Sequence, residues 1–283
     1  MRKALDPGVR DKDLFGRFQS PEGACLMANP LIEAKDFSYG EFAALVHKAG
    51  GREIVRAILR EEKLIQIVDP PRPQLFVSSE QQLENVRRWN DEHKLGFTDE
   101  DFARLGLPPV SGDGFVQPVL VMYLPNEKED KKGKTKENPT FELWWKIIVA
   151  QQPGEHRWSG VKSDSDHLKL LEGIEHPGKC LRWEVIDLAA NRNKKPKDVR
   201  SPQTSPHAGI LAAAAHFPKW VQAMDGETVP YVSIGGYELN VPVFGEWMHV
   251  LDLDWLAGNR QVRLLAFHAG FPNRYWAVPS LRE

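Results

Sequence analysis

The architecture of this chain is centred on one apolar segment, Ser205-Pro-His-Ala-Gly-Ile-Leu-Ala-Ala-Ala-Ala-His-Phe-Pro218. Ser205 and Pro206 are typical of the N-cap and first position of a helix, and Pro218 ends the segment because proline cannot continue one. The larger apolar residues lie on one helical face and alanines fill the rest, so every side needs covering. The segment therefore predicts a buried, central helix over residues 207–217.

Segments on both sides of this helix have the β-branched and aromatic content that is typical of strands. They are residues 118–124, 141–150, 181–188, 247–253 and 261–267. Before residue 110 the apolar residues recur at helical spacing, with Gly50-Gly51 as a stop and Thr98-Asp-Glu-Asp101 as a capping box. The sequence therefore predicts an α+β protein, with a small helical N-terminal domain followed by a larger strand-rich domain with a central buried helix. The expected parts are an irregular N-terminal arm (1–35), a helical domain (36–109) and an α+β domain (115–283).

Composition excludes several classes of protein. A chain of 283 residues can bury a core without disulfides or metals, and Cys25 and Cys180 alone do not make a disulfide framework. The formal net charge of −2 argues against a generally basic nucleic-acid-binding module. The motifs of phosphate-cradling loops, dinucleotide folds, zincins and nucleophile elbows are missing, which disfavours nucleotide hydrolysis, dinucleotide redox chemistry and zincin chemistry, and any cofactor is unknown.

The first residues and the apolar runs indicate where in the cell the protein is expected. Met1-Arg-Lys-Ala-Leu-Asp-Pro-Gly has positive charge but no apolar stretch behind it, unlike a signal peptide. The longest strongly apolar run, residues 210–217, is too short to cross a bilayer. The expectation is a cytoplasmic protein without a membrane partner.

The most site-like segment runs from His156 to His167. A metal-assisted hydrolase could use His156, Asp164, Asp166 and His167 as candidate catalytic residues, because carboxylates and imidazoles bind divalent ions and polarise water. A structural interpretation stands beside it, since Ser163 and Asp166 have capping-box spacing before an apolar run. In that interpretation a helix begins at Ser163 with His167 in its buried face, and no metal site is assigned.

The loop before this expected helix offers contacts for an anion. Arg157 can pair with a carboxylate or phosphate, and Trp158 can stack on a base or sugar. Lys162 and the free N–H groups of a helix that begins at Ser163 would complete an anion pocket. The alternative is a surface turn whose tryptophan packs inward.

The strongest local positive charge lies in the segment Asn191-Arg-Asn-Lys-Lys-Pro-Lys-Asp-Val-Arg200. Its basic residues, which could contact phosphates, are Arg192, Lys194, Lys195, Lys197 and Arg200. The proline and polar content also fits an exposed, flexible loop. A weaker nucleic-acid candidate is the basic stripe Arg52, Arg56 and Arg60, on a helix that follows Gly50-Gly51 as in a helix-turn-helix.

A predicted strand near the C-terminus carries Asp252 and Asp254 on one face and His249 on the other. Two carboxylates on one face could hold a metal ion. The more common arrangement is the solvent-exposed face of an edge strand, and this is the interpretation we favour.

Several strings resemble an uncharacterised protein family of uncultivated, small-genome (candidate-phylum) bacteria. They are residues 154–171, residues 180–185, the end of the apolar helix over residues 215–221, and residues 42–59 with their Ala-Gly-Gly. The resemblance implies a bacterial cytosolic protein. It transfers no activity, cofactor or catalytic residue.

These patterns together predict a non-enzymatic binding or interaction protein that contacts a polyanion such as nucleic acid. Its contacts would come from residues 156–162 and 191–200, with exposed tryptophans as stacking surfaces. The alternative is the metal-assisted hydrolase described above. Substrate, partner and oligomeric state do not follow from the residues.

Overall fold

The structure is a computed structural model that describes residues 74–109, 112, 114–125, 138–152, 154–241 and 247–282. By its contacts the chain divides into two compact units, Met1–Asp69 and Pro70–Glu283, and all described residues belong to the second. The expected arm, the helices before residue 63 and the basic stripe on Arg52, Arg56 and Arg60 lie outside the described residues. Among the described residues, no helix is long and apolar enough to cross a membrane.

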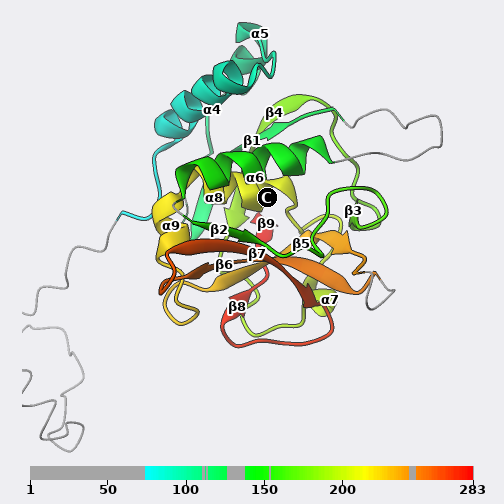
Figure 1. The fold of residues 1–283 in the computed structure, drawn as a ribbon. Coiled ribbons are helices and arrows are strands. Elements are labelled where there is room, and N and C mark those ends of the chain that lie inside the picture. Colours follow the sequence, from blue (N-terminus) through cyan, green and yellow to red (C-terminus); the bar gives the residue numbers. More distant parts are fainter. Residues whose placement is uncertain are drawn as a thin grey trace, which may run out of the picture. The chain divides into compact units, whose positions relative to one another are not determined.

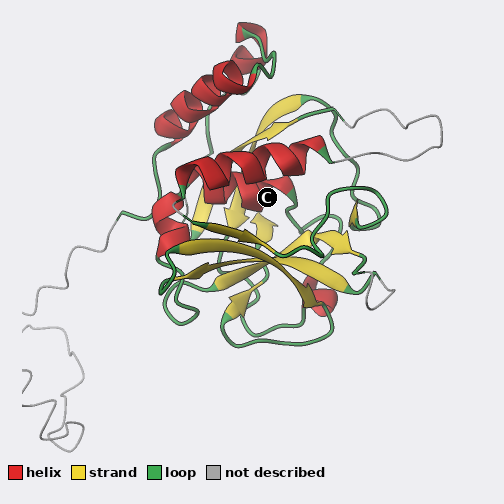
Figure 2. Cartoon of the chain, viewed as in Figure 1, coloured by secondary structure: helices red, strands yellow, loops and turns green. Residues whose placement is uncertain are grey.

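The described unit is a mixed α and β structure with two sheets, as Figures 1 and 2 show. The smaller sheet has the order β1-β4-β9, with all pairs antiparallel. Its strands are β1 (Val116–Tyr123), β4 (Cys180–Asp187) and β9 (Ser280–Arg282). The larger sheet has the order β2-β7-β6-β5-β3, and β8 pairs with β5 off this path. Its strands are β2 (Glu155–Arg157), β3 (Leu168–Leu170), β5 (Tyr231–Leu239), β6 (His249–Leu256), β7 (Gln261–His268) and β8 (Trp276–Ala277).

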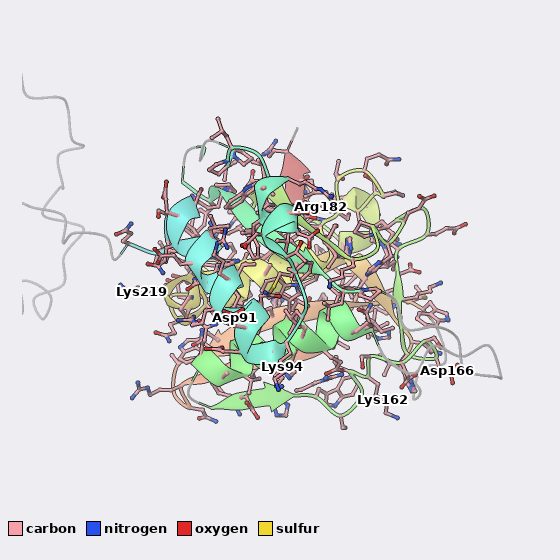
Figure 3. The ribbon with its side chains drawn as sticks, turned by 90° about the horizontal axis from the view of Figure 1, so that it is seen from above. Asp91, Lys94, Lys162, Asp166, Arg182 and Lys219 are labelled. Atoms are coloured by element: carbon pink, nitrogen blue, oxygen red, sulfur yellow. The ribbon has the colours of Figure 1, made fainter. Side chains whose placement is uncertain are left out.

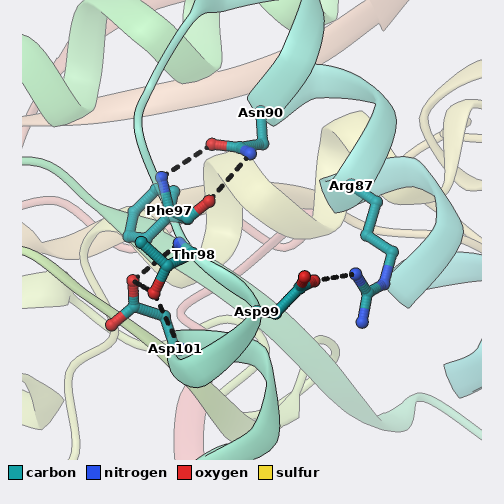
Figure 4. Close-up of polar contacts among 6 residues, drawn as sticks. All are labelled: Arg87, Asn90, Phe97, Thr98, Asp99 and Asp101. Atoms are coloured by element: carbon teal, nitrogen blue, oxygen red, sulfur yellow. Dashed lines mark hydrogen bonds and ion pairs between the residues drawn. The ribbon is translucent and has the colours of Figure 1, made fainter.

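Among the described residues two helices precede β1, and the cap of the second is the one that the sequence predicts. The first, α4 (Ser79–His93), has Ser78 as its N-cap and ends at Lys94, labelled in Figure 3, whose left-handed backbone (φ 53°) closes the last turn. The second, α5 (Asp99–Ala103), begins with the expected capping box, in which Thr98 and Asp101 bond each other's backbone (Figure 4). Both helices lie in the same compact unit as the strands.

The helix at the centre of the fold is confirmed. It is α8 (Ala208–His216), and every one of its residues is buried. It packs against α6 and against β1, and α9 (Pro218–Gln222) follows it directly. In Figure 1, α6 and α8 run beside each other above the larger sheet. An all-apolar helix requires this position because any exposed side would leave apolar surface in water.

The predicted strand over residues 141–150 is wrong, because the chain forms helix α6 (Pro139–Gln151) there. Asn138 accepts the backbone N–H of Phe141 as an N-cap, and Pro139 occupies the first turn. The segment contains β-branched and aromatic residues, which raise strand propensity but do not decide it. Here both broad faces of the helix are buried, so tertiary packing overrides the local preference.

Strand β5 was not predicted, because Gly235-Gly236 interrupts its apolar pattern. The glycines accompany a break in the pairing of β5 with β6 between Ile234 and Leu239. At Gly236 a Cβ atom would lie 2.7 Å from the carbonyl oxygen of Pro206 and 2.7 Å from Cβ of His207. Glycine is therefore required where β5 passes the beginning of α8.

In the part of the chain that the structure describes, side chains bond the backbone along the outer edge of β1 and no strand pairs there. Gln82 of α4 donates to the carbonyl oxygen of Pro118 (2.9 Å) and accepts the N–H of Leu120 (2.9 Å). His216 of α8 donates its Nε2–H to the Leu120 carbonyl oxygen (2.9 Å). Farther along, Trp144 bonds the carbonyl oxygen of Met122, and Thr140 bonds the backbone of Leu124. A buried edge needs such partners because unpaired backbone groups away from water are destabilising.

Candidate functional site

The predicted helix at Ser163 is wrong. Residues 164–167 form a turn, and the chain continues into β3, which pairs antiparallel with β5. The carboxylate of Asp164 accepts the backbone N–H of Asp166 (3.1 Å) and contacts Nδ1 of His167 at 2.6 Å. Aspartate favours such local turns over helix continuation because its side chain competes for nearby N–H groups.

The four candidate catalytic residues do not form one constellation. Asp164 and His167 are paired, whereas the side chain of Asp166 is exposed, as Figure 3 shows. His156 is an exposed residue of β2, on the strand that pairs with β7. Within the part of the chain that the structure describes, no three histidine, cysteine, aspartate or glutamate side chains are placed to share a metal ion.

The side chains expected to form an anion pocket at residues 157–162 mostly contact other parts of the protein. Arg157 forms an ion pair with Glu142 of α6 (Nη2 to Oε1, 2.9 Å), and its Nε donates to the Val161 carbonyl oxygen (2.7 Å). Trp158 is half-buried and packs against the core. Of the three side chains expected to bind the anion, Arg157, Trp158 and Lys162, the one that is exposed is Lys162, and the chain forms no helix at Ser163. This is the inward-packed turn that the sequence left open as the alternative.

The backbone of the basic segment, residues 191–200, is hydrogen-bonded to a neighbouring part of the fold. It contains the short helix α7 (Pro196–Val199). The backbone N–H of Asn193 donates to the Trp276 carbonyl oxygen (3.2 Å), and that of Lys197 donates to the Ala269 carbonyl oxygen (3.0 Å). The segment therefore runs alongside residues 269–276, the connection from β7 to β8. Left-handed backbone at Asn191 and Asn193 (φ 54° and 56°) makes this course possible.

The basic residues of this segment differ in their surroundings. Arg192, Lys194 and Lys197 are exposed, and Lys195 is half-buried. Arg200 is different, because its guanidinium pairs with Glu238 at 2.8 Å and its side chain is only 13% exposed. Arg200 therefore stabilises the fold and is not available to an external phosphate.

The connection from β7 to β8, which this segment runs alongside, carries a further cation and an exposed aromatic ring. Phe271 is 60% exposed and packs on the His268 ring, with centroids 4.8 Å apart. Arg274 and Arg192 line a shallow pocket of about 260 Å³ with Glu227 and Tyr275. We call these groups together the basic surface, made of Arg192, Lys194, Lys195, Lys197, Phe271 and Arg274. The prediction that tryptophans are exposed as stacking surfaces is wrong, since all nine are buried or half-buried.

The sequence missed a buried polar network on β4. Glu184 accepts hydrogen bonds at Oε1 from Tyr123 (2.6 Å) and from Nε (2.9 Å) and Nη2 (2.5 Å) of Arg182. The ring of Tyr123 contacts the His207 ring, which in turn contacts the Tyr237 ring, at centroid distances of 5.2 and 5.8 Å. These residues come from β1, β4, the start of α8 and β5, so no local spacing in the sequence could reveal the network.

Three atoms of the network are buried without a hydrogen-bond partner among the described residues. They are Oε2 of Glu184, Nε2 of His207 and the hydroxyl of Tyr237. Burial raises the pKa of Tyr123 and of Tyr237 well above that of a free tyrosine, so both keep their protons. The network therefore offers neutral hydrogen-bonding groups around one carboxylate and one guanidinium.

The carboxylates on β6 are also buried, so their expected place on a solvent-exposed edge is wrong. β6 lies between β5 and β7, and Asp252 and Asp254 share the face opposite His249, as predicted. Asp254 forms two short hydrogen bonds with Arg263 (2.7 and 2.5 Å), and Asp252 accepts one from Ser233 (2.7 Å). Burial raises the pKa of Asp252. Asp252 and Asp254 are therefore bonded to Ser233 and Arg263, side chains of the neighbouring strands.

Two of the buried histidines, His207 and His216, make the stability of the protein depend on pH. Burial lowers the pKa of His207 and of His216 to about 3, whereas the ordinary value is 6.5. Below about pH 6.5 the unfolded chain therefore binds protons that the folded chain does not, and stability falls until about pH 3. Each histidine contributes at most about 1.4 kcal/mol per pH unit in this window.

Replacing His216 with glutamine, which keeps a donor near the Leu120 carbonyl oxygen, should remove one of these two contributions. Urea unfolding between pH 7 and pH 4.5 should then give a variant whose free energy of unfolding falls less steeply, by roughly 1 kcal/mol per pH unit. Parallel curves for the variant and the wild-type protein would show that His216 is not held neutral.

No family model, curated protein or solved structure matches the chain. The resemblance to a family of small-genome bacteria stays a prediction.

Proposed function

We propose that the protein binds a polyanion, in the form of single-stranded nucleic acid, through the basic surface. The observation that supports this most directly is the pair of backbone bonds from Asn193 to Trp276 and from Lys197 to Ala269. They hold a run of cations alongside the connection that carries Phe271, which is 60% exposed. A fixed row of cations beside an exposed ring is the combination that binds phosphates and stacks a base.

The charge of this surface is local. The whole chain has a formal net charge of −2, so long-range attraction of a polyanion is weak. The basic surface, however, gathers five cations, while Asp198 and Glu227 are its nearest acids along these segments. Binding would therefore depend on direct contacts between phosphates and lysine or arginine side chains, and it would weaken steeply with salt.

The first test is fluorescence anisotropy of a fluorescein-labelled oligothymidylate of about 12 nucleotides, a length within the range that single-strand-binding folds cover. With about four phosphate contacts, the logarithm of the association constant should fall with the logarithm of salt concentration at a slope near −3. The double variant Lys194→Glu/Lys197→Glu should bind at least about tenfold more weakly at low salt.

A matched control distinguishes the effect of the basic surface from the effect of net charge. Lys146→Glu/Lys219→Glu changes the net charge equally at exposed lysines of α6 and α9, and it should bind like the wild-type protein. Phe271→Ala should weaken binding by about fivefold or more, because stacking contributes about 1–3 kcal/mol per base. Equal losses in the two double variants, or no binding at low salt, would overturn the proposal.

A further inference from the structure

The turn between α9 and β5 brings a carboxylate to the basic surface. Gly226 and Glu227 of this turn line the shallow pocket of about 260 Å³ together with Arg192, Arg274 and Tyr275. Arg192, Glu227 and Arg274 are exposed, so a ligand can reach all three charged groups. The pocket therefore offers one group that only accepts hydrogen bonds beside two groups that only donate them.

The pocket lies where the row of cations begins. Backbone bonds at Asn193 and Lys197 show that the segment 191–200 runs antiparallel to the connection from β7 to β8. The pocket residues Arg192 and Arg274 lie next to the first of these bonds along their own segments, and the lysines follow toward the second. A strand whose phosphates contact the lysines could therefore place its next base in the pocket.

The turn that carries Glu227 is held by its own hydrogen bonds. Oδ1 of Asp225 accepts the backbone N–H groups of residues 227–229, at 2.8, 2.8 and 3.0 Å. Gly226 has a left-handed backbone (φ 79°), and a Cβ atom there would lie 2.9 Å from Cβ of Tyr275. The backbone of Glu227 is therefore held close to the tyrosine, while its side chain is exposed.

The three charged groups of the pocket have no charged partner of their own. Among the residues that the structure describes, Arg192, Glu227 and Arg274 form no ion pair. Arg192 donates Nη2 to the carbonyl oxygen of Thr228, on the same turn (3.3 Å). The guanidinium of Arg274 lies over the ring of Tyr275, 4.5 Å from its centroid, and donates to the tyrosine hydroxyl. Both arginines are thus positioned without a carboxylate, and each has N–H groups left for a ligand.

This combination of charges fits one nucleic-acid base better than the others. Guanine presents two adjacent donors, N1–H and the 2-amino group, beside the acceptor O6. A carboxylate accepts both donors, and a guanidinium donates to O6. Thymine presents one N–H between two carbonyl acceptors, and adenine and cytosine each present one donor group beside an acceptor. A carboxylate can therefore form two adjacent bonds with guanine but only one with any other base.

We propose that this pocket selects a guanine base in the bound strand, an inference that rests on the single-strand binding proposed above. Glu227 accepts the N1–H and the 2-amino group, and Arg192 donates to O6. The base stacks on the guanidinium of Arg274, which Tyr275 supports on its other side, because bases stack on arginine as well as on aromatic rings. The phosphates and a second base still contact the lysines and Phe271.

The test measures competition with the fluorescein-labelled oligothymidylate on the full chain. Unlabelled competitors of the same length carry thymidylate alone, or a single dG at the 5′ end, in the middle or at the 3′ end. At least one dG strand should compete about tenfold more strongly than thymidylate alone, which is the discrimination expected of one bidentate contact. With dA at the same position the strand should compete like thymidylate. With deoxyinosine, which lacks the 2-amino group, most of the gain should be lost.

The protein variant Glu227→Gln should lose the preference for dG, because an amide replaces one acceptor oxygen by a donor. It should also bind thymidylate alone more tightly, because a negative charge is removed beside the phosphates. Glu84→Gln is the matched control, since it removes one exposed carboxylate from α4. That variant should keep the full preference for dG.

Four results would overturn the inference. Equal competition by all the strands would leave single-strand binding in place and remove the guanine pocket alone. An equal gain from dG and dA would mean that stacking of any purine sets the preference. An unchanged preference for dG in Glu227→Gln would place the guanine contact elsewhere. If no strand binds at low salt, not even labelled thymidylate, the proposed function fails and the guanine pocket fails with it.

Discussion

Replacing Gly209 with alanine should destabilise the folded protein by about 3 kcal/mol, at the upper end for an overpacked core. Gly209 lies in the first turn of α8, fully inside the core. A Cβ there would fall 2.7 Å from Cδ1 of Ile186 and closer still to Oε2 of Glu184. Relief would require Glu184 to move, and Glu184 is held by Tyr123 and Arg182.

Urea unfolding followed by tryptophan fluorescence measures this loss. Gly258→Ala is the control, because a Cβ at Gly258 meets no atom within 4 Å. That variant should stay within about 0.5 kcal/mol of the wild-type protein. A Gly209→Ala protein of unchanged stability would mean that the approach of α8 to β4 is looser than the structure shows.

Replacing Gln82 with leucine should lower the free energy of unfolding by roughly 3 kcal/mol, because two buried backbone groups lose their partners. The side chain of Gln82 bonds both the Pro118 carbonyl oxygen and the Leu120 N–H, and leucine can do neither. Leucine is similar in size and apolar, so the loss would reflect hydrogen bonding more than packing.

The neighbouring residue provides the comparison. Gln81 is exposed on the same helix and bonds only Glu84 and the helix cap. Gln81→Leu should therefore change the stability by less than about 0.5 kcal/mol in the same urea titration. Similar stability of the two variants would show that water reaches the edge of β1 and replaces the glutamine.

The parts of the fold that the sequence predicted are those set by local chemistry. The capping box of Thr98 and Asp101 marks the beginning of α5, and the apolar segment that follows Pro206 becomes α8. The errors arise where packing outweighs local preference. Residues 139–151 contain strand-type residues but are buried as a helix, and the Ser163–Asp166 spacing produces a turn stabilised by Asp164.

The candidate sites likewise divide into features that the local sequence shows and features that only the packing creates. The basic residues of 191–200 could be found from the sequence, because they follow one another closely along the chain. That Arg200 pairs with Glu238 and that Phe271 joins this surface depend on contacts across 38 and more residues. The network of Tyr123, Glu184 and His207 assembles from distant strands and a helix end, so only the three-dimensional structure reveals it.

The buried position of α8 has a consequence for how the chain can be divided. One segment of nine residues supplies contacts to β1, to α6 and, at its first turn, to β4 and β5. A truncation that separates residues before 200 from those after it would leave β1 and α6 without α8, and would expose the faces of α8 that they cover. Neither fragment would retain a closed interior, so we expect that neither folds on its own.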